Sequence, residues 1–218
     1  MVLKREGRAE IAENNSEETF MAEIKQGLRR SPALMSRFDT ALLVVDVQEK
    51  LLNLMDRREV VVWNIRRLVE TTGILEMPMF CTEQYPKGLG ATVSELAPLL
   101  RERTSKTSFS CCGEPGFLEQ VRAGDRPKIL VVGIETHVCV QQTVYYLMSE
   151  GFHVYVPIDA VASRFKEDYK WALRRMDSAG ATITTTESVI FEWCETASAS
   201  EFKEISRLAK ESRPDMPS

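Results

Sequence analysis

The chain has 218 residues, of which 44% are hydrophobic, and its 28 basic and 32 acidic residues give a net charge of -4. This composition is typical of an ordinary globular protein, and the scattered basic residues offer no long-range attraction to nucleic acid or anionic lipid. The longest apolar runs, at 41–45 and 129–132, are far shorter than the ~20 residues of a membrane span. We therefore expect a small-molecule substrate as the partner, with no nucleic acid and no membrane.

The cysteines and histidines limit the chemistry that the chain can carry. No CxxC spacing occurs among the five cysteines, so neither a disulfide framework nor a zinc knuckle is indicated. Only two histidines are present, which leaves little material for a histidine-based metal cluster. The N-terminal segment is rich in glutamate and has no apolar signal region, so we expect a cytoplasmic protein with reduced thiols.

Residues 1–36 are expected to form a polar N-terminal extension. Within it Phe20, Met21, Ile24 and Leu28 recur at helical spacing, which predicts a short amphipathic helix. We expect this helix to dock on the body of the protein or on a sister subunit; recruitment of a separate partner is the alternative. A single domain is predicted over 37–195, followed by a C-terminal helical tail over 196–218.

From residue 40 onward, short apolar segments alternate with longer helical ones. Strands are predicted at 41–46, 78–82, 103–108, 128–132, 153–158 and 181–184. Helices are predicted at 57–76, 92–100, 115–122, 137–150 and 166–179, with further helical segments to about 210. Apolar strands that alternate with helices indicate a parallel sheet covered on both faces. The predicted fold is a doubly wound, three-layer α/β fold with a mainly parallel six-stranded sheet.

Three reactive side chains from distant positions are expected at the carboxyl edge of this sheet. Asp46 ends the first predicted strand, Lys106 lies in the third, and Cys139 follows the fourth. In an open parallel sheet, ligands bind outside the carboxyl ends of the strands, where helix N-termini point their N–H groups. These side chains are therefore candidates for one pocket.

Cys139 lies in the predicted turn between the fourth strand and the next helix. Gly133 permits a sharp turn and Thr136 is a credible N-cap, which puts Cys139 in the first turn of the helix. There the helix dipole and free N–H groups favour a thiolate and would stabilise an oxyanion. An isolated cysteine is equally typical of a small buried core side chain, so the local sequence leaves both interpretations open.

Asp46 closes a fully apolar strand, where a carboxylate must be hydrogen-bonded, paired or functional. A nearby lysine would satisfy it, but a role in capping the helix after Gln48 explains the residue as well. Lys106, taken by itself, is most typical of an exposed charge at a strand edge. Spacing alone does not choose between these interpretations.

Several segments together resemble a known superfamily. Residues 41–48, 106–110 and 133–140 resemble, in order, the three signature segments of isochorismatase-like cysteine hydrolases. The resemblance extends from about 40 to 193, through 159–164 and 186–190. Residues 81–90, followed by Thr92 and Glu95, look like the isochorismatase domain-containing group of that superfamily.

The resemblance implies a role for each matched residue. Asp46 would be the general base that takes the thiol proton, Lys106 would lower the pKa of the thiol, and Cys139 would be the nucleophile. Backbone N–H groups of Glu135 and Cys139 would form the oxyanion hole, beside a cis peptide between Ile134 and Glu135. Hydrolysis of a C–N bond of the amide type through a Cys139 acyl-enzyme is the implied reaction, and a homo-oligomer, a dimer or higher, is the implied assembly.

One departure from the superfamily pattern bears on cofactors. Nicotinamidases carry an Asp-x-His motif and a further histidine after the second strand, which bind a metal, whereas 82–90 contains no histidine. No metal and no other cofactor is therefore predicted, and neither nicotinamide nor isochorismate is expected as the substrate. Side chains expected to line the substrate pocket are Gln48, Thr82, Tyr85, Phe109 and Thr136.

Two other functions remain open from the sequence. A catalytically idle, oligomeric binding or scaffold protein of the same fold has its best support in the N-terminal helix. A thiol-redox protein would need a second cysteine within reach of Cys139, and the adjacent pair Cys111 and Cys112 draws attention, although ordinary loop or core thiols are preferred for it. His137 is expected at the rim of the pocket, because residues at i and i+2 on a helix do not face each other.

Overall fold

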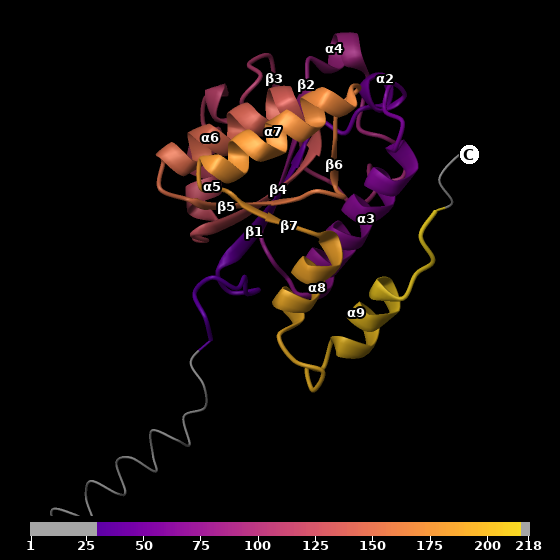
Figure 1. Ribbon diagram of the computed structural model, residues 1–218, viewed down its shortest axis with the longest axis vertical. Coiled ribbons are helices and arrows are strands. Elements are labelled where there is room, and N and C mark those ends of the chain that lie inside the picture. The colour runs from indigo at the N-terminus through magenta and orange to yellow at the C-terminus, as the bar shows by residue number, and fades with distance from the viewer. Residues whose placement is uncertain (1–29, 215–218) are drawn as a thin grey trace, which may run out of the picture. The chain divides into compact units, whose positions relative to one another are not determined.

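The computed structural model describes residues 30–214, and the chain divides into two units, Met1–Leu34 and Met35–Ser218 (Figure 1). The first unit is described only over 30–34, where the Leu34 N–H donates to the Ser31 carbonyl at 3.1 Å to close a turn. The helix predicted around Phe20 to Leu28 lies outside the described residues. Across the described part of the chain, no helix is both long and apolar enough to cross a membrane.

The second unit contains a parallel sheet in the order β3-β2-β1-β4-β5-β7, with β6 paired to β4. Its strands are β1 (Thr40–Val45), β2 (Met79–Gln84), β3 (Thr104–Lys106), β4 (Lys128–Ile134), β5 (His153–Pro157), β6 (Val161–Ala162) and β7 (Thr182–Thr184). All six predicted strands are present, and every strand pair is parallel. The two-residue β6 is additional, because so short a strand leaves no pattern in the sequence.

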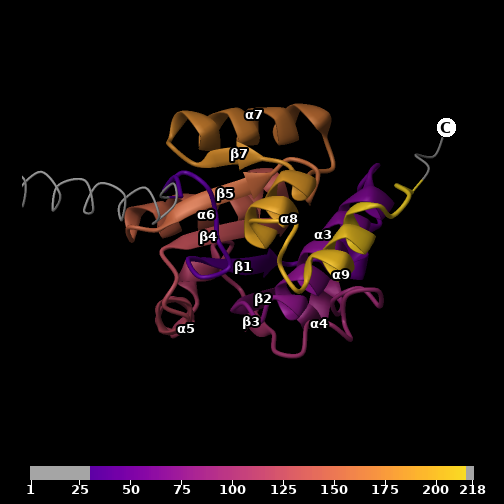
Figure 2. The ribbon, with the colours of Figure 1, turned by 90° about the horizontal axis from the view of Figure 1, so that it is seen from below.

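The central strands are buried on both faces, which is why they are continuously apolar. In β1, Leu42 and Val44 belong to one hydrophobic cluster, whereas Ala41, Leu43 and Val45 belong to another. The first cluster includes side chains of α3, α8 and α9, and the second includes side chains of α5, α6 and α7. Figure 2 shows α3, α8 and α9 gathered on one side of the sheet. The predicted three-layer α/β fold is thereby confirmed.

The helices follow the predicted order. They are α2 (Glu49–Leu52), α3 (Arg58–Ile74), α4 (Pro86–Leu89), α5 (Phe117–Ala123), α6 (Gln141–Ser149), α7 (Lys166–Ser178), α8 (Thr186–Cys194) and α9 (Phe202–Ala209). Two short non-α turns join them, the 3₁₀ turn η1 (Cys111–Gly113) and the π-helical turn η2 (Thr136–Val140). The one-turn helices α2 and α4 are too short to show helical periodicity, and the sequence did not predict them.

Three helix predictions need correction. The segment 92–100 is not a helix but a series of turns, with Val93, Leu96 and Leu100 buried in the core; its apolar spacing reflects packing alone. Pro115 precedes α5, which begins after Gly116 at φ +81°. The helix predicted at 137–150 is interrupted, since η2 precedes α6.

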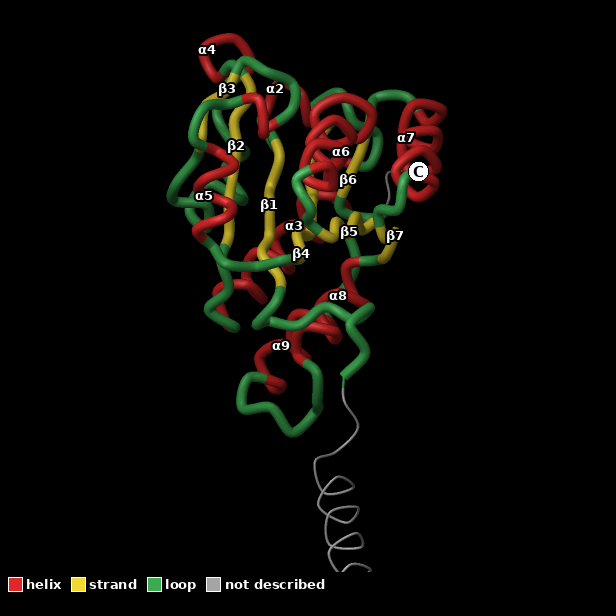
Figure 3. Tube along the Cα trace, turned by 90° about the vertical axis from the view of Figure 1, so that its left-hand side faces the viewer, coloured by secondary structure: helices red, strands yellow, loops and turns green. Residues whose placement is uncertain are grey.

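The carboxyl edge of the sheet is where the loops of interest meet. β1, β2 and β3 run side by side, and the short helices α2 and α4 lie beyond their carboxyl ends (Figure 3). Next to β1, β4 runs directly into η2, and β6 pairs with the last two residues of β4. Side chains that end β1, β3 and β4 therefore converge at one edge.

Candidate active site

A buried ion pair forms the base of the site. Nζ of Lys106 lies 2.7 Å from Oδ2 of Asp46, and neither side chain has exposed surface. Asp46 follows β1 with φ +52°, in the left-handed region that aspartate adopts more readily than most residues. Lys106 is the last residue of β3, two strands away from β1 in the sheet. Lys106 thus ends an edge strand but is not an exposed charge, and the Asp46 side chain does not cap α2, whose N-cap is Gln48.

The ammonium group of Lys106 is surrounded by hydrogen-bond acceptors of the protein. Besides Asp46, its Nζ donates to Gln84 Oε1 at 2.8 Å and to the carbonyl oxygens of Phe109 at 3.0 Å and Ser108 at 3.2 Å. Burial lowers the pKa of Lys106, but the charge of Asp46 and its hydrogen bond outweigh that effect and raise it. The lysine is thus held as a cation at neutral pH.

The other carboxylate oxygen of Asp46 is held by the second strand. Thr82 donates from Oγ1 to Asp46 Oδ1 at 2.7 Å, and the same hydroxyl lies 3.5 Å from Sγ of Cys111. Cys111 is fully buried, and burial raises its pKa to about 12. The sequence singled out Cys111 only as one of an adjacent pair, and did not place it behind Asp46.

The nucleophile turn is the segment from Ile134 to Val140. Its first peptide, between Ile134 and Glu135, is cis, as the resemblance implied. The backbone N–H groups of Val138 and Val140 donate to the Glu135 carbonyl at 3.1 and 3.2 Å. The Cys139 N–H, one of the two donors expected for an oxyanion hole, lies between these two amides.

Gly133, just before this turn, is required by packing. Its φ is +118°, and a Cβ built there would lie 2.0 Å from the carbonyl oxygen of Val45. The glycine therefore lets β4 approach β1 closely, and this approach brings the nucleophile turn beside Asp46. The sequence predicted only that Gly133 permits the turn, and the contact with Val45 is a further reason for glycine at this position.

Cys139 is 5% exposed and lies beside the buried pair. Burial raises its pKa, Asp46 raises it further through its charge and a hydrogen bond, and the opposing effect of Lys106 is smaller. The resting group at neutral pH is therefore the thiol. Burial beside the Asp46 carboxylate thus opposes the helix N-terminus, which by itself favours a thiolate.

Thr136 is fully buried in the same turn, and its Oγ1 has no hydrogen-bond partner among the described residues. Glu135, with no side-chain capping bond, occupies the N-cap position that was predicted for Thr136. A buried hydroxyl without a partner loses the hydrogen bonds that water would give it.

The side chain of Glu135 has a partner that the sequence left unidentified. Its Oε2 accepts from the backbone N–H of Arg164 at 3.0 Å and from Arg164 Nε at 3.1 Å. Arg164 therefore holds the nucleophile turn in place through Glu135. His137 is also tied, through its Nδ1 and Ser163 Oγ at 3.0 Å, and lies in the turn without serving Cys139 as a dyad partner.

The remaining predicted pocket residues fall into two groups. Gln48 is buried, with Nε2 donating to the carbonyls of Gln84 and Gly90 and Oε1 accepting from the Gln84 N–H, so its amide holds the loop after β2. Tyr85 and Phe109 are 53% and 56% exposed at the same edge. Of the five predicted pocket residues, only Tyr85 and Phe109 are exposed to solvent.

The residues that would hold a metal do not gather in the described part of the chain. No group of three or more histidine, cysteine, aspartate or glutamate side chains there has the geometry of a metal site. All five cysteines are free thiols.

Comparisons with known proteins identify relatives across most of the chain. The isochorismatase domain model matches residues 40–188. Isochorismatase domain-containing protein 2 of Danio rerio is 37% identical over 181 residues, which cover 83% of this chain and 92% of the relative. The MAR1 ribonuclease structure from Caenorhabditis elegans is 38% identical, covers 84% of this chain and 96% of its own, and has a TM-score of 0.79.

A more distant structure shares the fold. The YcaC gene product of Escherichia coli, described as an octameric hydrolase of unknown specificity, is 23% identical with a TM-score of 0.71, over 78% of this chain and 86% of its own.

Proposed function

The chain belongs to the isochorismatase-like hydrolase family, and from that premise we propose that it is a metal-independent cysteine hydrolase cleaving an amide-type C–N bond of a small molecule. The observation that carries this proposal is the Asp46 carboxylate, which Lys106 and Thr82 fix beside the Cys139 thiol. A carboxylate oxygen accepts more than one hydrogen bond, so Asp46 retains capacity for the thiol proton.

The proposed first step begins from the neutral thiol. Asp46 takes the proton from Cys139 as Sγ attacks the carbonyl carbon, and the oxygen becomes an oxyanion. The N–H groups of Glu135 and Cys139 would hold that oxyanion. The C–N bond then breaks, and the amine leaves with the proton carried by Asp46.

The second step releases the acyl group. Water gives a proton to Asp46 and attacks the thioester carbon, the C–S bond breaks, and the proton returns to Sγ as the acid leaves. Lys106 stays protonated throughout, since its hydrogen bonds and the charge of Asp46 raise its pKa. Its charge offsets the negative charge that moves between Asp46, Cys139 and the oxyanion.

Trapping of the acyl-enzyme tests this proposal. The protein would be exposed to a panel of small amides and activated esters, and its intact mass measured. We expect one acyl group on the wild-type chain and none on Cys139→Ser, with Cys112→Ser as the matched control because Cys112 is the most exposed of the cysteines. Acylation or turnover that persists in Cys139→Ser would reject the proposal, and chelators should leave turnover unchanged.

Two alternatives are outcomes of the same panel. The name of the Caenorhabditis elegans relative makes RNA cleavage a second candidate, so a fluorescent RNA belongs in the panel. RNA cleavage without any amide or ester turnover would favour that candidate. A panel with no reaction at all would favour the idle scaffold.

The assembly is proposed to be a homo-oligomer. The YcaC structure is described as an octamer, although that likeness concerns the fold. Sedimentation velocity at two protein concentrations tests the proposal, and a single species with the mass of one chain, 24.7 kDa, would contradict it.

A further inference from the structure

A cavity of about 310 Å³ lies between β6, the first turns of α7 and the residues just before α3. We call it the β6 cavity. We propose that it binds a carboxylate group of the substrate, so that the enzyme acts on small acyl compounds that carry a negative charge. This inference rests on the proposed cysteine hydrolase function.

The β6 cavity adjoins the nucleophile turn. Val161 and Ala162, which line it, pair with Gly133 and Ile134 at the end of β4. Neighbouring strands lie about 4.8 Å apart, and β4 continues directly into the turn that carries Cys139. The cavity is therefore next to the strand end from which the Cys139 turn begins.

The wall of the cavity and the nucleophile turn also share hydrogen bonds. Ser163 bonds to His137, and Arg164 bonds to Glu135 through two nitrogens. Both Ser163 and Arg164 line the cavity. The cavity wall is thus fixed relative to the turn, as a substrate subsite requires.

The charges that line the cavity favour an anion. Four cationic side chains and one carboxylate line it: Arg57, Arg164, Lys166, Lys170 and Asp56. Arg164 is neutralised by Glu135. Among the described residues, no carboxylate lies within ion-pairing distance of Lys166 or Lys170. Two uncompensated lysines therefore remain.

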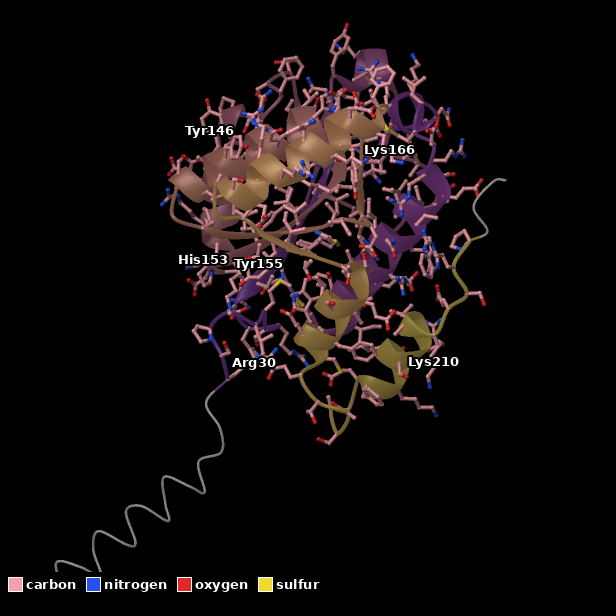
Figure 4. All side chains as sticks on the ribbon, viewed as in Figure 1. Arg30, Tyr146, His153, Tyr155, Lys166 and Lys210 are labelled. Carbon is pink, nitrogen blue, oxygen red and sulfur yellow. The ribbon has the colours of Figure 1, made fainter. Side chains whose placement is uncertain are left out.

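These two lysines repel each other until an anion arrives. Lys166 and Lys170 are four residues apart on α7, so they share a face of the helix, and like charges at this spacing destabilise a helix. Figure 4 shows Lys166 at the beginning of α7. A bound carboxylate would replace this repulsion with attraction to both amines.

The rest of the lining selects an organic anion. Val161 and Ala162 are buried apolar side chains, and Tyr169 also lines the cavity. The volume matches the small end of the range for small-molecule sites. A lining that combines apolar side chains with cationic ones fits an aliphatic carboxylate with a short carbon chain.

Paired chromogenic esters test the inference. The anionic probes are the mono-4-nitrophenyl esters of succinate and glutarate, and the neutral reference is 4-nitrophenyl butyrate. Stopped-flow absorbance would give the acylation rate of Cys139 with each. We expect a five- to tenfold preference for an anionic ester, about the effect of two partly exposed ion pairs, and a smaller preference at high salt.

The variant Lys166→Gln/Lys170→Gln should reduce the anionic-to-neutral rate ratio toward one. Its matched control is Lys203→Gln/Lys210→Gln, which removes the same charge from exposed positions on α9 and just after it, and this control should keep the ratio. Lys210 lies far from Lys166 in Figure 4. Equal rates for the two ester types in the wild-type chain, or an unchanged ratio in the first variant, would overturn the carboxylate site.

These outcomes are distinct from failure of the proposed function. If no ester gives a nitrophenolate burst that Cys139→Ser abolishes, the cysteine hydrolase proposal fails and the subsite falls with it. A Cys139-dependent burst without a charge preference overturns the subsite alone.

Discussion

Lys106 and Asp46 form an ion pair of 2.7 Å in which both side chains are wholly inaccessible to solvent. Taking one partner away leaves an uncompensated buried charge, which costs about 3–5 kcal/mol. Each member of the pair is therefore needed for the stability of the fold and is also a candidate catalytic residue. The two roles can be separated by experiment.

Lys106→Met should lower the free energy of unfolding by about 3–5 kcal/mol, because it leaves the Asp46 carboxylate buried without a cationic partner. Asp46→Asn/Lys106→Met should recover part of that loss, since no charge then remains buried. Urea denaturation would measure both. Recovery of stability without recovery of acylation would separate the two roles, and a double variant less stable than Lys106→Met would contradict the expectation.

Gln84 is expected to act as a positioning residue for Lys106. Gln84→Leu removes the acceptor that lies 2.8 Å from Nζ, and loss of a hydrogen bond to a charged group corresponds to about 1.5–3 kcal/mol. We expect kcat/KM to fall by roughly tenfold or more, with the change mainly in kcat. Gln84→Glu keeps an acceptor oxygen and is the control; equal losses in the two variants would show that the acceptor is not what matters.

Gly133→Ala should prevent the close approach of β4 to β1. The added Cβ would lie 2.0 Å from the Val45 carbonyl, and the positive φ is itself unfavourable for alanine. We expect a loss of at least about 3 kcal/mol in unfolding free energy, measured by urea denaturation. Gly151→Ala is the control, since its φ is also positive but no atom lies within 4 Å of the added carbon. Comparable losses in both variants would leave backbone strain as the sole cause.

Stability should fall at alkaline pH because of the buried thiols. Burial raises the pKa of Cys111 from 9.0 to about 12, so above pH 9 the unfolded chain loses a proton that the folded chain keeps. The contribution is fully present below pH 9 and is lost as the pH rises toward 12. Urea denaturation from pH 8 to 11 should show a smaller slope for Cys111→Ala than for the wild-type chain, and parallel slopes would contradict this.

Much of the fold was predictable because buried parallel strands are continuously apolar. The central strands β1 and β4 carry that signal fully. The outer strands β3 and β7 are largely polar, β6 has two residues, and the short helices α2 and α4 have four each. The turns over 92–100 have the sequence pattern of a helix because Val93, Leu96 and Leu100 are buried in the core at helical spacing. Periodicity reports which side chains are buried, and it does not report the backbone that buries them.

Less of the candidate site was predictable from local sequence. Strand ends placed Asp46, Lys106 and Cys139 at one edge, and the resemblance gave them roles that stay proposals. Gln84 and the Glu135 side chain went unnoticed, since a glutamine at a strand end or a glutamate in a turn is ordinary in sequence. Their importance comes from partners 22 and 29 residues away, which no local pattern encodes.

The two hydrogen bonds that Arg164 donates to Glu135 have a consequence for selectivity. A molecule that displaces the Arg164 segment would also displace Glu135 in the nucleophile turn, because the main-chain N–H and the Nε of Arg164 both donate to the Glu135 carboxylate. A ligand bound in the β6 cavity would then change the orientation of the Cys139 Sγ. For compounds without a carboxylate, the thiol would be less well oriented toward the carbonyl carbon. Selectivity between substrates would therefore appear in the acylation rate as well as in the binding affinity.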